Sequence, residues 1–338
     1  MIKTPLLTLL ASLAFSQGAF ALGVSFDRQG DLAAFARSSG IPPAVPGLSP
    51  SAPADTAPGF CVFNANNGAA MAGREVLKTA AQENNVLCVG ESHDQLNDHL
   101  AQLEALKVLN EVRGSNVVVG FEMLNMTLQP VLDEYASGKI TEAEFLKKAG
   151  WQKEWGFDFN LYKPLFDFIR EKKLGALALN LPKKVVSNIA KLGLDGLSQE
   201  DRKYLPADLQ VTANAQYIAY IRESFQGHMA DMFKFENYLA AMSAWNETMG
   251  ARMADFINAN PGYSGLVVAG SGHVIFNAGI PASIQARAPG AKVASFFMQG
   301  SEACPSTFPE ADLGLADYAW YVRHTGPEKK FQFIPLLP

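Results

Sequence analysis

The sequence predicts an α/β fold in which a mostly parallel central sheet is flanked by helices and an α-helical insert forms a lid. Short apolar runs of strand length alternate with longer segments whose apolar residues recur at helical spacing. The runs are apolar throughout, as parallel strands buried on both faces are. Two of them, Val86–Val89 and Leu266–Ala269, end in a glycine followed by polar side chains. In open α/β folds such strand ends lie at the carboxyl edge of the sheet, where ligands bind.

Five parallel strands are expected, each separated from the next by helical sequence. They are Val86–Val89, Val117–Phe121, Ala176–Leu179, Leu266–Ala269 and Val293–Phe297. Residues 316–323 alternate between apolar and polar side chains, which predicts a late strand at an edge of the sheet.

Two helices are expected between the early strands. The first carries an apolar stripe at helical spacing: Leu96, Leu100, Leu103 and Leu106. Asp94 stands before this stripe, where an N-cap residue belongs. Residues 162–173 predict the second helix, because their apolar side chains fall on one face.

Two longer inserts interrupt the alternation. Residues 124–156 are amphipathic and end in an aromatic group, and residues 197–257 are mostly helical with a break at Gln226-Gly227. Because such inserts follow sheet strands, we expect the second one to form a lid over the carboxyl edge.

The first 21 residues have the features of a signal peptide. Lys3 gives a positive start, residues 6–15 give a short apolar stretch, and Ala19-Phe20-Ala21 gives the small residues that signal peptidase reads. We therefore expect export to the periplasm with cleavage after Ala21. The apolar stretch is shorter than the ~20 residues of a spanning helix, and no other segment predicts one.

The remaining chain divides into three parts. Residues 22–69 predict an extension rich in Pro, Ser and Ala, residues 70–323 predict one α/β domain that contains the insert 197–257, and residues 324–338 predict a tail. The formal net charge of −5 becomes −6 once Lys3 is removed. This acidity argues against nucleic acid as a partner, which would require a basic face.

Three cysteines leave room for one disulfide and one unpaired thiol. Cys88 lies within an expected buried strand, where it is interpreted as a small core residue. Cys61 and Cys304 flank the core, and a disulfide between them would tie the extension to the C-terminal segment. The sequence leaves this pairing open.

Polar side chains follow four of the expected strands. They are Glu91, His93, Glu122, Asn180 and His273. Because parallel strands end at one edge of a sheet, we expect these side chains to converge. His99 is interpreted as a partly buried helix residue, and His324 as a solvated residue of the tail.

Two imidazoles with a carboxylate suit three tasks. His93, Glu122 and His273 could bind a divalent metal such as zinc or manganese. Together with Glu91 they could perform acid–base catalysis in hydrolysis. They could also line a polar pocket around a larger ligand, and the sequence leaves these alternatives open.

Residues 217–249 are rich in aromatic side chains and methionine. On a continuous helix Tyr217, His228 and Phe235 would fall on one stripe. Core packing explains most of this composition, but histidine and tyrosine also ligate haem iron, and apolar aromatic walls suit a porphyrin. His228 is therefore the candidate iron ligand, with Tyr217 or Tyr220 as the rival.

An ordered set of motifs resembles the ChaN-type haem-binding uptake proteins of the Tiki superfamily, to which erythromycin esterases are related. The set is Val89–Asp94 with His99 and Gln102, Gly120–Met123, Trp155, Tyr162, Asn180–Lys183, His228, Trp245–Met249, Gly270–His273, Gly279–Pro281 and Ala316–Tyr318. The resemblance implies an α/β core with a helical insert, haem bound at or near that insert, and a homodimer around stacked haems as one arrangement.

The sequence therefore indicates two alternative functions. The first is a periplasmic haem-binding protein of haem or iron uptake or trafficking, a binding protein rather than an enzyme. The alternative is a metal-dependent hydrolase, a protease or esterase, that uses His93, Glu122 and His273.

Overall fold

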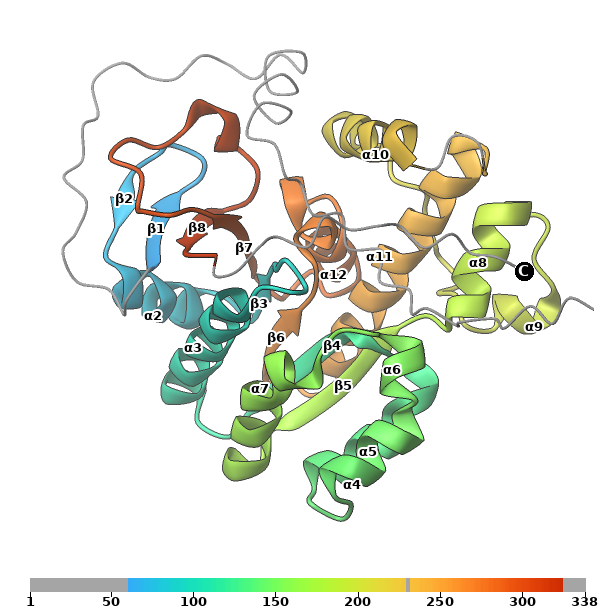
Figure 1. Cartoon of the computed structure of the whole chain (residues 1–338), viewed down its shortest axis with the longest axis horizontal. Coiled ribbons are helices and arrows are strands. Elements are labelled where there is room, and N and C mark those ends of the chain that lie inside the picture. Colours follow the sequence, from blue (N-terminus) through green and yellow to red (C-terminus); the bar gives the residue numbers. More distant parts are fainter. Residues whose placement is uncertain (1–59, 229–231, 325–338) are drawn as a thin grey trace, which may run out of the picture.

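The computed structural model describes residues 60–228 and 232–324, and its centre is an eight-stranded sheet with the order β2-β1-β8-β7-β3-β6-β4-β5 (Figure 1). The strands are β1 Phe60–Asn64, β2 Ala70–Met71, β3 Val86–Val89, β4 Val117–Asn125, β5 Gly175–Asn180, β6 Ser264–Val268, β7 Val293–Gly300 and β8 Tyr318–Val322. Every pairing among β3 to β8 is parallel, whereas β1 pairs antiparallel with β2 and β8. The predicted α/β class with a mostly parallel sheet is confirmed.

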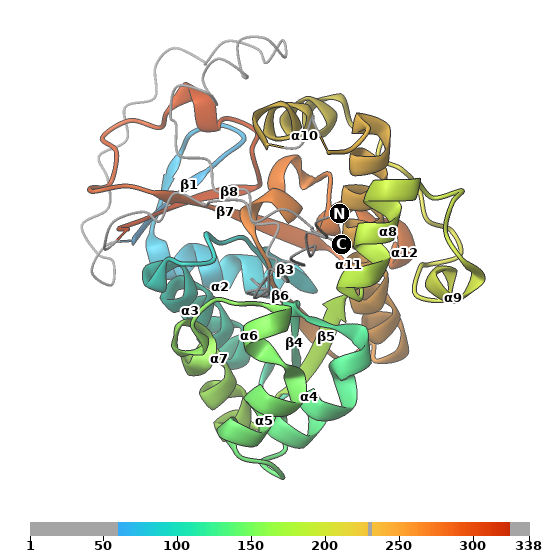
Figure 2. The same ribbon diagram turned by 45° about the vertical axis from the view of Figure 1, so that its right-hand side comes forward.

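Helices cover both faces of the sheet (Figure 2). They are α2 Gly73–Glu83, α3 Leu96–Arg113, α4 Gln129–Ala136, α5 Glu142–Ala149, α6 Trp151–Glu154, α7 Phe159–Lys172, α8 Lys183–Leu192, α9 Gln199–Arg202, α10 Ala215–His228, α11 Phe235–Ala259 and α12 Ile280–Arg287. Side chains alternate between the faces of a strand. In β3, Leu87 and Val89 therefore pack in the layer of α2, α3 and α7, while Val86 and Cys88 pack in the layer of α8, α11 and α12.

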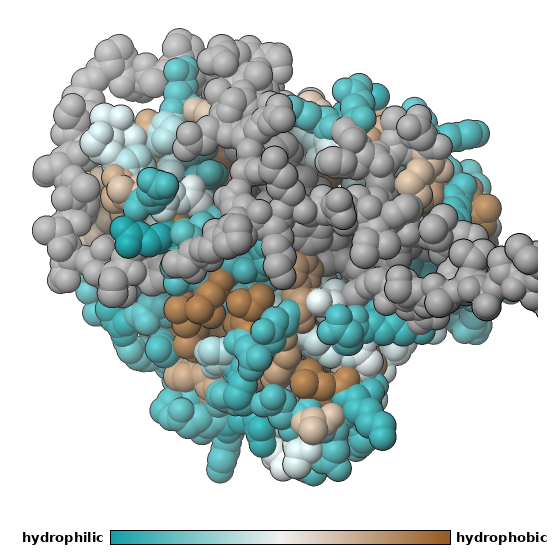
Figure 3. Space-filling model, in the orientation of Figure 1, coloured by the Kyte–Doolittle hydropathy of each residue, from teal (hydrophilic) through white to brown (hydrophobic). Residues whose placement is uncertain are grey.

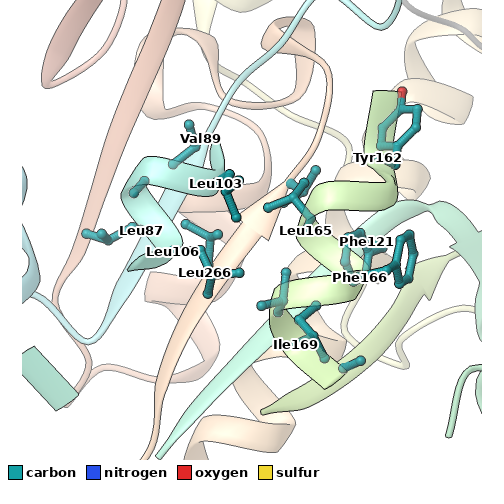
Figure 4. Packing of buried hydrophobic residues seen from close by; sticks show 14 of the residues in the cluster. Leu87, Val89, Leu103, Leu106, Phe121, Tyr162, Leu165, Phe166, Ile169 and Leu266 are labelled. Carbon is teal, nitrogen blue, oxygen red and sulfur yellow. The ribbon is translucent and has the colours of Figure 1, made fainter. Parts of the chain in front are cut away.

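The first layer is a contiguous apolar core between α3, α7 and the sheet (Figure 4). Leu103 and Leu106 of α3 and Phe166 of α7 are buried there, and Phe166 stacks on Phe121 of β4 with ring centroids 4.5 Å apart. Tyr162 stands at the top of this core with its oxygen directed away from the apolar side chains (Figure 4). The core thus places one hydroxyl at the carboxyl edge of the sheet.

The start of α3 differs from the expected apolar stripe. Leu96 and Leu100 are 41% and 36% exposed, and Figure 3 shows apolar surface where α3 begins. Gln95 is the N-cap residue and makes no capping hydrogen bond with its side chain, so the prediction of Asp94 as the cap is wrong. In the first turns of α3 the leucines therefore lie on the exposed side, whereas Asp98 and His99 are buried.

Two predictions about the ends of the domain are also wrong. Residues 60–64, expected within the extension 22–69, form β1, and residues 318–322 form an interior strand instead of an edge strand. Both errors have one cause: β1 pairs along the whole of β8, so residues 60–64 join the sheet and β8 is no longer at its edge. A disulfide between Cys61 and Cys304 joins β1 to the loop after β7.

The predicted insert 197–257 contains α9, α10 and α11. Most of α11 is buried against the sheet and α8, so this helix belongs to the core layer. The predicted break in this insert is confirmed directly after Gln226-Gly227, since α10 ends at His228 and α11 begins at Phe235.

The predicted signal peptide, residues 22–59 and the tail from residue 325 lie outside the described residues. Within the described ranges, no helix has the length and apolar character needed to cross a membrane.

Candidate functional site

The carboxyl edge of the sheet carries a buried cluster of two glutamates and three histidines. Glu91 and His93 follow β3, Glu122 lies within β4, and His273 follows β6. His99 joins them from the first turns of α3, and none of the five residues is more than 3% exposed. The structure therefore brings the predicted edge residues together and adds a third imidazole.

Glu91 lies between two imidazoles. Its Oε1 lies 2.6 Å from Nδ1 of His93, and its Oε2 lies 2.7 Å from Nδ1 of His99. The hydroxyl of Tyr162 donates to Oε1 over 3.2 Å. Burial alone would raise the pKa of Glu91, but the two histidines outweigh burial and lower this pKa to about 2. Glu91 is therefore an ionised carboxylate over the ordinary pH range.

Both ring nitrogens of His99 face acceptors. Nε2 lies 3.2 Å from the carbonyl oxygen of His93, and Nδ1 lies against the carboxylate of Glu91. A carbonyl and a carboxylate can only accept, so both nitrogens carry protons and the ring is an imidazolium. The pKa of His99 agrees, because burial would lower it but the charge of Glu91 raises it. Glu91 and His99 thus form a buried ion pair.

His93 uses one nitrogen for Glu91 and leaves the other without a protein partner. Among the described residues, its Nε2 is buried and makes no hydrogen bond. The ring packs edge-on against Trp155, with centroids 4.7 Å apart, and against Phe157 at 5.2 Å. A buried polar atom without a partner costs about 1–3 kcal/mol. Such an atom is typical of a site where a ligand or a reacting group completes the hydrogen bonding.

Glu122 forms the second carboxylate–imidazole pair. Its Oε1 lies 3.2 Å from Nε2 of His273, and its Oε2 accepts a 2.6 Å hydrogen bond from the main-chain amide of Gly270. Burial would raise the pKa of Glu122, but the charge of His273 and these hydrogen bonds lower it. Asn180 holds the strand in place, because its Nδ2 donates to the main-chain oxygen of Glu122 over 2.7 Å.

Gly270 separates the two pairs. A Cβ atom at this position would lie 2.8 Å from Cε1 of His93 and 3.6 Å from Oε2 of Glu122. Any side chain there would displace the ring of His93. The glycine after β6 is therefore required for the two carboxylate–imidazole pairs to lie next to each other.

A cleft of about 500 Å³, including space open to solvent, lies over this cluster. It is lined by Met123, Asn125, Glu154, Trp155, Asn180, Leu181, Lys183, Val186, Ser187 and Trp245. Trp155 contacts His93, and Trp245 packs edge-on against His273 with centroids 5.2 Å apart. The cleft is therefore separated from each reactive imidazole by one indole ring. Its mostly apolar lining with a few polar side chains is that of a small-molecule site.

The predicted haem ligands lie on α10. Tyr217 and Tyr220 are fully buried, and the Tyr217 hydroxyl donates to the carbonyl oxygen of Gly272 over 3.1 Å. Burial raises the pKa of both tyrosines. His228 is the last residue of α10, and its side chain lies outside the described residues.

The predicted metal set is not preformed. No group of three or more His, Cys, Asp or Glu side chains in the described part of the chain is arranged to hold a metal ion. His93 is oriented by Glu91, whereas His273 is oriented by Glu122. Each of these two imidazoles therefore faces its own carboxylate.

Two histidines have environments that the sequence did not reveal. His99 is predicted to be a partly buried helix residue, but it is fully buried and pairs with Glu91. His324 was expected to be solvated, but its Nε2 lies 3.2 Å from Oδ1 of the buried Asp98. Glu91 lies outside the helix that carries His99, and Asp98 is distant in sequence from His324. No local sequence pattern therefore predicts either contact. The motif set that resembles the ChaN family includes His99 but indicates no partner for it.

The family of the chain is defined by its sequence as well as by this fold. The family model described as haem-binding uptake, Tiki superfamily, ChaN matches residues 77–284, which is more than half of the chain. The chain therefore belongs to this haem-binding uptake family. A comparison with curated proteins gives no significant match.

Several solved structures are similar to this chain at low sequence identity. A structure of cofacial heme binding to ChaN of Campylobacter jejuni has a TM-score of 0.60 and 18% identity, and the match covers 80% of this chain and 98% of that one. The type III effector HopBA1 has a TM-score of 0.45 and 13% identity, with coverage of 75% and 94%. A mutant of the erythromycin esterase EreC in its open conformation has a TM-score of 0.42 and 13% identity, with coverage of 67% and 72%.

Proposed function

We propose that this protein binds haem and serves haem or iron uptake or trafficking in the periplasm. The observation that carries the proposal is membership of the haem-binding uptake family over residues 77–284. The Campylobacter jejuni relative, whose structure is described as binding haem cofacially, supports it. The signal-peptide features of residues 1–21 support the location.

The surface between α10 and α11 suits a porphyrin. Met232 is 38% exposed, and Phe233 and Phe235 are half-buried beside it. The guanidinium of Arg222 lies 3.8 Å from the ring centroid of Phe235, and Lys234 is exposed nearby. Apolar rings with cations at their border match a haem macrocycle and its propionates. We propose that bound haem contacts this surface, where it would supply an iron centre.

His228 is the proposed iron ligand, with Tyr217 and Tyr220 as rivals. His228 ends α10 and precedes Met232 of the surface just described by four residues in the chain. Ligation by Tyr217 would require its hydroxyl to leave Gly272 and a fully buried position. Breaking a buried hydrogen bond without replacement is unfavourable by about 1–3 kcal/mol, which favours the histidine.

Haemin titration of the full-length protein tests this function. We expect a saturable shift of the Soret band, and at least about a tenfold loss of affinity in H228A, since a lost ligand typically costs this much or more. H324A is the matched control and should bind as the wild type does. Absence of a saturable shift would contradict haem binding. A shift unchanged when His228, Tyr217 and Tyr220 are all substituted would contradict the ligand assignment.

A second function is favoured by the unpartnered Nε2 of His93. We propose as the alternative that His93 acts as a general base in ester or peptide hydrolysis. Glu91 would hold a proton on Nδ1, so the unpartnered Nε2 would accept one from the attacking water molecule. Glu122 and His273 lie across Gly270, where they could protonate the leaving group.

A hydrolysis screen with aryl esters and fluorogenic peptides tests the alternative. Activity should fall about 10²–10⁴-fold in H93Q, which is the range of general base catalysis, and should not change in H324Q. The metal-dependent form further requires loss of activity with a chelator and recovery with zinc or manganese. Activity that is absent, or equal in H93Q and wild type, would eliminate this function.

A further inference from the structure

A buried amide links α10 to the histidine that follows β6. Oδ1 of Asn246 lies 2.7 Å from Nδ1 of His273, and Nδ2 of Asn246 donates to the Tyr217 hydroxyl over 2.8 Å. The Tyr217 hydroxyl in turn donates to the carbonyl oxygen of Gly272 over 3.1 Å. Four groups from three segments therefore form one unbranched chain of hydrogen bonds.

The direction of this chain is set at its carbonyl end. The Gly272 oxygen can only accept, so the single hydroxyl proton of Tyr217 points to it. The tyrosine oxygen then acts as an acceptor towards Asn246, which must present its NH₂ group there. The amide oxygen of Asn246 consequently faces His273, and because that oxygen only accepts, Nδ1 must carry the proton.

The surroundings hold the amide in this orientation. Asn246, Tyr217 and His273 are each no more than 3% exposed, so water does not compete for these hydrogen bonds. The backbone of Gly279 closes the pocket, since a Cβ there would lie 2.2 Å from the His273 carbonyl oxygen and 3.1 Å from Nδ2 of Asn246. Rotation of the amide by half a turn would set two donors, or two acceptors, against each other at both of its contacts.

We propose that Tyr217 and Asn246 are positioning residues that keep the proton of His273 on Nδ1 and direct Nε2 towards Glu122. Nε2 lies 3.2 Å from Oε1 of Glu122 and makes no hydrogen bond to a described residue, so in this tautomer Nε2 is the atom that takes up a second proton when the ring becomes charged. The role of Tyr217 is then to orient the amide, and it acts on His273 only through Asn246. This inference does not depend on haem binding or on hydrolysis.

The tautomer of His273 can be read directly by long-range ¹H–¹⁵N NMR of the full-length protein with labelled histidine. The chain has five histidines, and H273Q assigns the signal. In wild type the neutral ring should carry its proton on Nδ1. In Y217F the side-chain amide of Asn246 loses the acceptor that fixes its orientation. The population of the Nε2–H tautomer should then increase about fivefold, as expected for one lost buried hydrogen bond. Y263F removes the hydroxyl of a tyrosine before β6 that packs on Phe256, away from this chain of hydrogen bonds, and should match wild type.

Substitution of Asn246 separates positioning from a merely structural role. An aspartate carboxylate presents an acceptor to His273 in either orientation, so its effect does not require Tyr217. The proton of His273 should therefore stay on Nδ1 in N246D and return to Nδ1 in the double variant Y217F/N246D. N246L should increase the Nε2–H tautomer of His273, although no residue of α10 is substituted. An Nε2 proton on His273 in wild type would overturn the inference. An unchanged tautomer in both Y217F and N246L, or a failure of N246D to rescue Y217F, would also overturn it.

Discussion

Replacement of Glu91 by glutamine tests the buried ion-pair network most directly. The substitution keeps the shape of the side chain but removes the negative charge between His93 and His99. Lowering the pKa of Glu91 from 4.5 to about 2 corresponds to roughly 3 kcal/mol of stabilisation, at about 1.4 kcal/mol for each tenfold change in acidity. Removal of one partner from a buried pair typically costs about 3–5 kcal/mol. We therefore expect E91Q to lose roughly 3 kcal/mol of unfolding free energy.

The loss should depend on pH. The carboxylate of Glu91 contributes fully above its unfolded pKa of 4.5, and its contribution disappears as the pH falls towards 2. The pKa values of His93 and His99 are raised in the folded state. Their contribution is therefore complete below the unfolded value of 6.5 and disappears as the pH rises through the folded values. The difference between wild type and E91Q should be largest between about pH 4.5 and 6.5.

Urea unfolding at several pH values measures this difference. E75Q is the matched control, because Glu75 is an exposed partner of Lys78 on α2 and should change stability by less than about 0.5 kcal/mol. If E91Q unfolds within about 1 kcal/mol of wild type at pH 5.5, the network does not stabilise the fold as argued. A difference that grows steadily to pH 9 would refute the raised pKa values of His93 and His99.

Three further predictions follow from single contacts. C61S/C304S should lose up to about 5 kcal/mol of unfolding free energy, because the disulfide closes a loop of 243 residues, and urea unfolding with and without reductant checks this. G279A should lose roughly 2 kcal/mol or more, since its Cβ would collide with a main-chain oxygen at 2.2 Å, whereas G290A meets no atom within 4 Å and should melt as wild type does. Y162F should lose about 1–3 kcal/mol by removing a hydrogen bond to a buried carboxylate, and an unchanged urea midpoint would contradict that contact.

The parallel core of the sheet could be predicted because its signal is local. A strand buried on both faces must be apolar throughout, so Val86–Val89 was recovered with its observed bounds. β4 was expected to end at Phe121 but continues to Asn125, because the pairing with β5 resumes after an irregularity. Glu122 therefore lies within a strand rather than after one.

The pairing of β1 with β8 could not be predicted in the same way. The two strands come from opposite ends of the described chain, and neither contains information about the other. A strand that lacks a recognisable neighbour looks like an edge strand in sequence.

The candidate site was also predictable only where its signal is local. Glycines at two strand ends indicated Glu91, His93 and His273, since the sharp turn after each strand is encoded locally. The partners that determine their protonation, His99 and Asn246, are placed by the packing of α3 and α11. That packing depends on the whole core, so residue spacing alone does not reveal it.

The β1–β2 hairpin has a consequence for the solubility of folding chains. Without it, β8 would present a full row of unpaired backbone groups that a second chain could extend. The described sheet ends instead at β2, which has two residues, Ala70–Met71. The disulfide between Cys61 and Cys304 links the hairpin covalently to the loop after β7, so the hairpin stays next to β8 when backbone hydrogen bonds of the sheet open locally. A chain at high local concentration is thereby protected from strand-to-strand aggregation at this side of its sheet.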